Sequence, residues 1–207
     1  EVANMWNQVE KVDLNDHPKH HQHTVDFVTN ASNLPCQWQV ANAGKAKSGL
    51  NTLYYGDLAA GNYNCGGANS GDALSSEISL MPGYGYTLRF DLFMDTEAGT
   101  FYDKLFISIY QDGKKYELWT KAKLPQAKAW TSHAIDLNAF AGKTIQLEFL
   151  FDTKDGVANS TSGVFIDDLK IESTCTSVTC TNNGDCNDTF GFSSESSEGG
   201  VCAFTLP

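Results

Sequence analysis

Residues 88–94 read Leu-Arg-Phe-Asp-Leu-Phe-Met, with apolar side chains at positions 88, 90, 92 and 94. Arg89 and Asp91 stand between them. Successive side chains of a strand point to opposite faces of a sheet, so this period of two predicts a strand with one buried face. Residues 105–110 and 145–151 repeat the pattern. These three runs predict a chain built from half-buried antiparallel strands.

Similar short runs continue on both sides of this stretch, separated by Gly, Asn, Asp and Pro. The pair Asp112-Gly113 is typical of a hairpin turn, and only residues 137–140 favour a helical turn. The further candidate strands are residues 25–29, 38–40, 53–55, 77–80, 116–119, 132–135 and 164–171. About ten strands predict an all-β fold of two packed antiparallel sheets.

Changes in composition divide the chain into three predicted parts. Residues 1–23 have weak periodicity and are interpreted as an N-terminal arm or linker. Residues 24–173 form the predicted sandwich. Residues 174–207 are rich in Cys, Ser, Thr, Asn and Gly, which indicates a small tail held by its cysteines rather than by an apolar core.

The charge of the chain narrows the choice of partners. It has 25 acidic and 14 basic residues among 207, a formal net charge of -11, which disfavours nucleic acid as a partner. The same surplus of carboxylates favours divalent cations such as calcium. No apolar run is long enough to cross a bilayer, so this fragment is not expected to insert into membranes. Because the first residues lack the features of a signal peptide, the sequence is interpreted as part of a longer mature chain.

Six cysteines indicate an oxidising compartment, and hence an extracellular or cell-surface protein. Four of them lie between Cys175 and Cys202. A structural zinc site is the alternative, but no C-x-x-C pair is present. Cys36 and Cys65 are the only two outside the tail, so they are predicted to pair with each other.

Several motifs in the middle of the chain occur in a familiar order. They are residues 53–57, 61–63, 74–80, 102–105 and 163–169, the last reading Gly-Val-Phe-Ile-Asp-Asp-Leu. In this order they resemble the MAM-like jelly rolls, and the absence of the four cysteines of vertebrate MAM domains favours bacterial relatives such as cleaved-adhesin domains. The resemblance covers residues 26–175. It implies a jelly-roll sandwich without catalytic activity, often carrying structural calcium, that mediates adhesion or recognition.

The tail is similar to the first part of an EGF-like module, although the last pair of EGF cysteines is missing. The resemblance rests on Cys175, Cys180, Cys186 and Cys202. In that family the first cysteine pairs with the third and the second with the fourth. The resemblance therefore implies the disulfides Cys175–Cys186 and Cys180–Cys202.

The candidate metal ligands start from the pair Asp167-Asp168. Strict alternation places Asp167 on the same face as Phe165, Leu169 and Ile171, and a buried carboxylate needs a cation or several N–H donors. Calcium takes oxygen ligands from loops, and the alternative is that these residues are solvated turn residues. The predicted ligands are Asp57, Asn62, Glu97, Asp152, Asp167 and Asp168.

Aromatic side chains in loops are candidates for stacking on sugar rings, and Tyr63 and Tyr84 are the two expected to be exposed. The sequence contains no serine-hydrolase or metalloprotease motif, and His133 has only Asp136 near it in the sequence. An enzyme is therefore not predicted. The leading hypothesis is a calcium-stabilised, non-catalytic binding or adhesion module that recognises a glycan or an extracellular protein. The alternative is an accessory or spacer domain of a larger secreted enzyme, for example a protease.

Overall fold

A computed structural model describes residues 36–42, 44–121 and 128–174 with their side chains. For residues 9–11, 26–29, 175, 194–198 and 201–205 it describes the backbone. Nearly all of the regular structure in these parts consists of strands, and a short 3₁₀ helix covers Asn138–Phe140. The turn predicted at residues 137–140 is therefore confirmed. No helix in these segments is long and apolar enough to cross a membrane.

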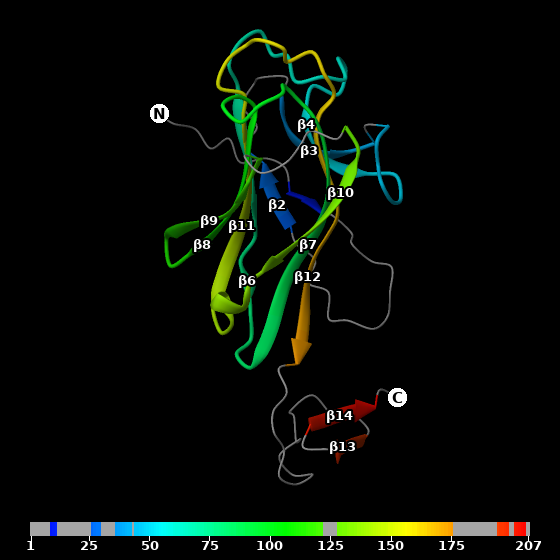
Figure 1. The fold of residues 1–207 in the computed structure, drawn as a ribbon, viewed down its shortest axis with the longest axis vertical. Helices are drawn as coiled ribbons and strands as arrows, with labels where there is room; N and C mark the ends of the chain where they lie inside the picture. Colours follow the sequence, from blue (N-terminus) through cyan, green and yellow to red (C-terminus); the bar gives the residue numbers. More distant parts are fainter. Residues whose placement is uncertain are drawn as a thin grey trace.

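Two antiparallel sheets face each other and form a sandwich (Figure 1). Sheet A has the order β1 (Val9–Lys11), β2 (Asp26–Thr29), β5 (Ser70–Ser75), β11 (Thr144–Asp152), β8 (Lys104–Gln111), β9 (Lys114–Thr120), and β6 (Ile78–Ser79) also pairs with β11. Sheet B has the order β10 (Trp130–Asp136), β7 (Tyr84–Asp95), β12 (Gly163–Cys175), β4 (Thr52–Gly56), β3 (Gln37–Ala41). The predicted all-β, two-sheet fold is confirmed.

The connectivity of eight of these strands is that of a jelly roll. Taking β4, β5 and β7 to β12 in chain order, the first pairs with the last, the second with the seventh, the third with the sixth and the fourth with the fifth. Such nested pairing wraps a long hairpin into two sheets. It also brings segments far apart in the sequence side by side in each sheet.

Two further parts of the chain carry strands that the periodicity did not indicate. β1 lies within the predicted N-terminal arm and pairs with β2 at the edge of sheet A, and β5 lies next to β2. In the tail, β13 (Ser194–Glu198) pairs with β14 (Val201–Thr205).

The core lies between the sheets and consists of the inward side chains of both. Leu88, Phe90 and Leu92 face it from sheet B, as the alternation in residues 88–94 predicted, and Phe149 faces it from sheet A. Trp38 of β3 is 1% exposed, and its Nε1 donates a hydrogen bond to the carbonyl oxygen of Gly71 on β5 at 2.9 Å. This bond joins β3, at the edge of sheet B, to sheet A.

Strand β12 departs from strict alternation, and the prediction made for its inner face is wrong. Its register against β7 shifts between Asp167 and Lys170, and Asp168 has a φ of 49°. A bulge adds one residue to a strand and so exchanges the faces beyond it. Val164 and Ile166 point into the core before the bulge and Leu169 after it, whereas Asp167 is partly exposed and lies outside the core.

The predicted hairpin turn at Asp112-Gly113 is confirmed. It joins β8 to β9, and the two residues have φ values of 50° and 74°. Two successive positive φ angles are those of a type I′ turn, which favours this dipeptide because glycine and aspartate tolerate the left-handed region.

The disulfide Cys36–Cys65 is present, with a Cα–Cα distance of 6.0 Å. It joins the residue before β3 to the loop after β4. Because the bridge spans 29 residues, replacing both cysteines by alanine is expected to lower the free energy of unfolding by about 3 kcal/mol, through the greater freedom of the unfolded chain. Urea unfolding of the double variant beside the wild type measures the loss. An unchanged midpoint would contradict this role.

Candidate functional site

Four aromatic side chains lie in a row on the outer face of sheet B, which is turned away from sheet A. They come from four neighbouring strands: Trp130 on β10, Phe93 on β7, Phe165 on β12 and Tyr54 on β4. The chain neighbours of the last three rings belong to the core. Side chains alternate along a strand, so the rings themselves lie outside it. We call these four residues the aromatic row.

The rings of the aromatic row contact one another in sequence. Tyr54 stacks on Phe165 with centroids 4.6 Å apart, Phe165 meets Phe93 edge-on at 5.7 Å, and Phe93 lies 5.8 Å from Trp130. Trp130 and Phe93 are partly exposed, whereas Phe165 and Tyr54 are 2% and 1% exposed. Outward positions of an antiparallel sandwich are usually polar, so an unbroken aromatic row marks this face as specialised.

The loop between β3 and β4 lies over this face, and we call its residues 44–50 the strap. Lys45 of the strap places its Nζ 4.7 Å from the ring centroid of Phe93 and 5.9 Å from that of Phe165. The same Nζ donates a hydrogen bond to Ser162 Oγ at 3.0 Å. The ammonium group therefore lies directly on the aromatic row.

Carboxylates on β7 and β12 hold the strap in place. The backbone N–H groups of Lys47 and Ser48 donate to Asp167 Oδ2 at 2.7 and 3.2 Å, and Ser48 Oγ donates to Asp168 Oδ1 at 2.5 Å. Lys47 Nζ lies 2.5 Å from Asp91 Oδ2. Burial acts to raise the pKa of Asp91, but hydrogen bonds from Lys47 and Ser132 outweigh it and leave that pKa lowered.

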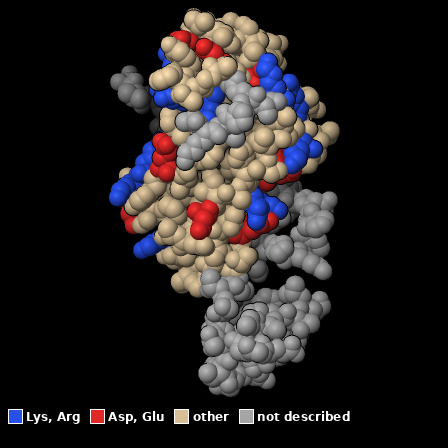
Figure 2. Space-filling model, viewed as in Figure 1, with Lys and Arg blue, Asp and Glu red and all other residues tan. Residues whose placement is uncertain are grey.

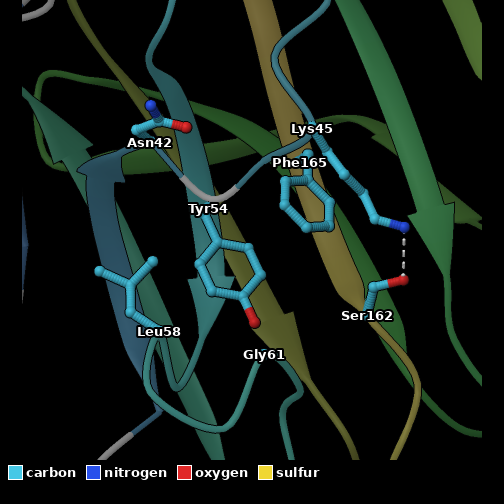
Figure 3. A pocket seen from close by; sticks show the side chains of 7 residues that line it. All are labelled: Asn42, Lys45, Tyr54, Leu58, Gly61, Ser162 and Phe165. Atoms are coloured by element: carbon cyan, nitrogen blue, oxygen red, sulfur yellow. Dashed lines mark hydrogen bonds between the residues drawn. The ribbon is translucent and has the colours of Figure 1, made fainter.

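A pocket of about 160 Å³ opens where the strap, β4 and the end of the aromatic row meet (Figure 3). The stacked rings of Tyr54 and Phe165 lie beside each other on one side of it, and Leu58, which is 43% exposed, lies on another. Burial first and the Asp57 carboxylate second raise the pKa of Tyr54 to about 12, so its hydroxyl stays protonated at neutral pH. The residues that line the pocket are Asn42, Lys45, Tyr54, Leu58, Gly61, Ser162 and Phe165.

Of the two tyrosines predicted to be exposed in loops, Tyr63 is buried, and that expectation is wrong. It is 0% exposed, and its hydroxyl donates to Asp103 Oδ2 at 2.5 Å. Its loop packs back onto the core, where its ring meets that of Phe151 edge-on. Tyr84 is partly exposed beside Tyr86, and its role in stacking stays a prediction.

The six residues predicted to bind calcium do not form one cluster. Asp57 Oδ1 accepts from the backbone N–H of Ala59, Asn62 Oδ1 from that of Asn64 and Asp152 Oδ1 from that of Lys154. Asp167 and Asp168 hold the strap, as described above. Glu97 donates its own backbone N–H to Asp103 Oδ2 at 2.6 Å.

Among the described residues, no group of three or more His, Cys, Asp or Glu side chains is placed to hold a metal ion. Calcium binding stays a prediction. The tail disulfides Cys175–Cys186 and Cys180–Cys202 involve side chains outside the described residues.

His133 lies at the edge of the sandwich, between the sheets. Its ring stacks on Phe90 with centroids 5.1 Å apart, and Trp119 approaches it edge-on at 5.5 Å. Its Nε2 lies 2.8 Å from Thr131 Oγ1. Burial lowers the pKa of His133 more than the Asp91 carboxylate raises it, so the ring is neutral at pH 7.

A second exposed apolar surface occurs where loops 57–69, 96–103 and 153–162 meet, at the upper end in Figure 1. There Phe101 is 78% exposed, Val157 is 65% exposed and Tyr102 is 43% exposed. We call these three residues the loop-end patch. Figure 2 shows that basic and acidic side chains lie next to one another on the face in view, with no continuous basic surface there.

No family model matches the chain, and no curated protein sequence matches it. Solved structures with a similar fold include TmCBM61 in complex with β-1,4-galactotriose, at 13% identity and a TM-score of 0.46 over 72% of this chain and 88% of that one. A family 11 carbohydrate-binding module from Clostridium thermocellum, in complex with a β-1,3-1,4-mixed-linked tetrasaccharide, is 13% identical, with a TM-score of 0.37 over 78% of this chain and 94% of the module.

The glycoside hydrolase domain of Endo-D from Streptococcus pneumoniae R6 is 14% identical, with a TM-score of 0.46, over 74% of this chain and 22% of that one. Similarity of this extent does not carry a ligand or an activity over to the present chain. The resemblance to MAM-like and cleaved-adhesin domains likewise stays a prediction.

Proposed function

We propose that this chain is a non-catalytic glycan-binding module that holds its ligand on the outer face of sheet B. The observation that carries the proposal is the aromatic row together with the pocket at its end. Flat aromatic rings present an apolar surface that fits the C–H faces of sugar rings, and polar groups beside them fix the orientation of hydroxyls. Trp130 and Phe93, the partly exposed members of the row, supply the aromatic surface, and Asn42, Lys45 and Ser162 supply the polar groups.

The geometry of the row suits an elongated ligand. Its four rings follow a line across β10, β7, β12 and β4, perpendicular to the strands, and the most exposed of them lie at the β10 and β7 side. A chain of sugars that lies along this line would contact Trp130 and the exposed part of Phe93 and meet Lys45 before the pocket beside Tyr54. We infer an extracellular setting from the disulfide Cys36–Cys65.

Replacing Trp130 by alanine is expected to weaken glycan binding at least tenfold, because truncating a tryptophan that anchors a ligand commonly costs about 2 kcal/mol or more. An array of neutral and acidic glycans identifies a ligand, and calorimetry compares the variants. Phe101→Ala is the matched control, since it removes an exposed aromatic ring from the loop-end patch. The variant is expected to bind as the wild type does. If Phe101→Ala loses binding and Trp130→Ala keeps it, the site is the loop-end patch and this proposal is wrong.

A further inference from the structure

We propose that the pocket beside Lys45 binds the carboxylate of an acidic sugar, so that the ligand of the module is a uronate-containing glycan. This inference rests on the proposed function and names the ligand class of the same site. The observation behind it is the surroundings of the Lys45 ammonium group in a protein of net negative charge.

Lys45 is the one charged residue among those that line the pocket. The chain as a whole has a net charge of -11. The side chains that line the pocket include one cation and no carboxylate, so the charge of this lining is opposite in sign to the net charge of the chain. A positive group at the end of an apolar surface attracts an anionic ligand and repels a cationic one.

Lys45 also differs from several other lysines of the sandwich in forming no ion pair with a carboxylate among the described residues. Lys47, Lys128 and Lys154 lie within ion-pair distance of Asp91, Asp95 and Asp152. Within residues 36–42, 44–121 and 128–174, no such ion pair includes Lys45, whose Nζ donates to Ser162 Oγ and faces aromatic rings. An ammonium group has three N–H donors, so two remain for a ligand.

The two acidic residues next to the pocket are already engaged. Asp95 Oδ2 accepts hydrogen bonds from Ser162, and its Oδ1 lies 3.0 Å from Lys128 Nζ. Asp57 Oδ1 accepts from the backbone N–H groups of Ala59 and Ala60. Neither forms an ion pair with Lys45, whose ammonium group can therefore pair with a ligand carboxylate.

The size and the walls of the pocket suit a single sugar ring better than a longer segment. Its volume of about 160 Å³ lies below the roughly 300–1,000 Å³ of pockets that enclose drug-sized ligands. Tyr54 and Phe165 form an aromatic wall, and Asn42 adds an exposed amide at the rim. A uronate ring can face the aromatic wall while its carboxylate accepts hydrogen bonds from Lys45.

The test compares an α-1,4-linked trigalacturonate with its methyl ester, which keeps the rings and removes the charge. At low ionic strength the acid is expected to bind the wild type about tenfold more tightly than the ester, because a charge-assisted hydrogen bond is stronger than a neutral one. Lys45→Gln is expected to abolish this preference, so that the variant binds the acid no more tightly than the ester. Lys143→Gln is the matched control, because it removes the same charge from an exposed turn before β11.

The outcomes separate this inference from the proposed function. Equal binding of acid and ester by the wild type, with Lys45→Gln indistinguishable from it, overturns the inference and leaves a module for neutral glycans. An acid preference that falls equally in Lys45→Gln and Lys143→Gln also overturns it, because the attraction would then come from overall charge. If no glycan of any kind binds, both proposals are wrong.

Discussion

Replacing Lys121 by methionine is expected to lower the free energy of unfolding by about 1–3 kcal/mol, the usual cost of leaving the partners of a buried hydrogen-bond donor unsatisfied. Lys121 is 2% exposed, and its Nζ donates to Thr96 Oγ1 at 3.0 Å, to the carbonyl of Glu97 at 2.8 Å and to that of Tyr102 at 3.3 Å. The ammonium group thus joins β9 to the loop that follows β7. Without it, the carbonyl oxygens of Glu97 and Tyr102 lose this donor, and a buried carboxylate loses a nearby cation.

The carboxylate in question is Asp103. It is 0% exposed, and burial raises its pKa although Tyr63, the Glu97 N–H and Lys121 act to lower it. Burial likewise lowers the pKa of Lys121 to about 8 against the opposing pull of Asp103 and Glu97. Burial therefore disfavours both charges, and the attraction between them opposes that effect.

Urea unfolding of Lys121→Met, of Asp103→Asn and of the double variant forms a cycle that measures this coupling. The double variant is expected to lose less than the sum of the single losses, since it leaves no unpaired buried charge. Additive losses would show that the two groups act independently.

The pKa of Lys121 also has a consequence for pH dependence. Its folded value of about 8 lies below its ordinary value of 10.5, so the unfolded chain binds more protons between these limits. The stability contributed by this group should rise with pH across that window, and the rise should be missing in Lys121→Met.

Replacing Trp38 by alanine is expected to cost about 3–5 kcal/mol of unfolding free energy, the usual range for a large aromatic side chain in a core. Trp38 contacts Tyr55 edge-on at 5.5 Å and lies 6.3 Å from Phe149 of the opposite sheet. Truncation would leave a cavity between the sheets and an unpaired carbonyl at Gly71.

Trp38→Phe separates the two contributions, because it keeps most of the ring and removes the indole N–H. It is expected to lose about 1–2 kcal/mol, from the unpaired Gly71 carbonyl and a smaller cavity. Thermal and urea unfolding measure both variants. A loss under 1 kcal/mol in Trp38→Ala would mean that the sheets are joined without this side chain.

Much of the fold follows from the sequence because strand periodicity is a local property. The alternation in residues 88–94 and 145–151 identifies core positions such as Phe90 and Phe149, and Asp112-Gly113 identifies its own turn. The pairing of Cys36 with Cys65 follows by elimination, because the other four cysteines lie in the tail. β5 was missed because glycine and polar residues interrupt its alternation.

The candidate site was harder to predict because it depends on register and packing. The bulge at Asp167-Asp168 exchanges the faces of β12. The sequence there does not predict a bulge, because aspartate adopts a positive φ only in some contexts. The aromatic row requires that Phe93, Phe165 and Tyr54 lie at the same level of three adjacent strands. These strands are far apart in the sequence. Local alternation could show that these rings face outward but not that they adjoin.

The indole N–H signals of the protein in a nitrogen-edited NMR titration test the central claim most directly. The chain has four tryptophans, of which Trp130 lies on the outer face of sheet B, Trp119 at the edge of the sandwich and Trp38 in its core. The titrant is the oligosaccharide that binds most tightly in the glycan array, and single tryptophan variants assign the signals. Binding on the outer face predicts a large shift of the Trp130 signal and little change for Trp38. An unmoved Trp130 signal at saturation would contradict the account.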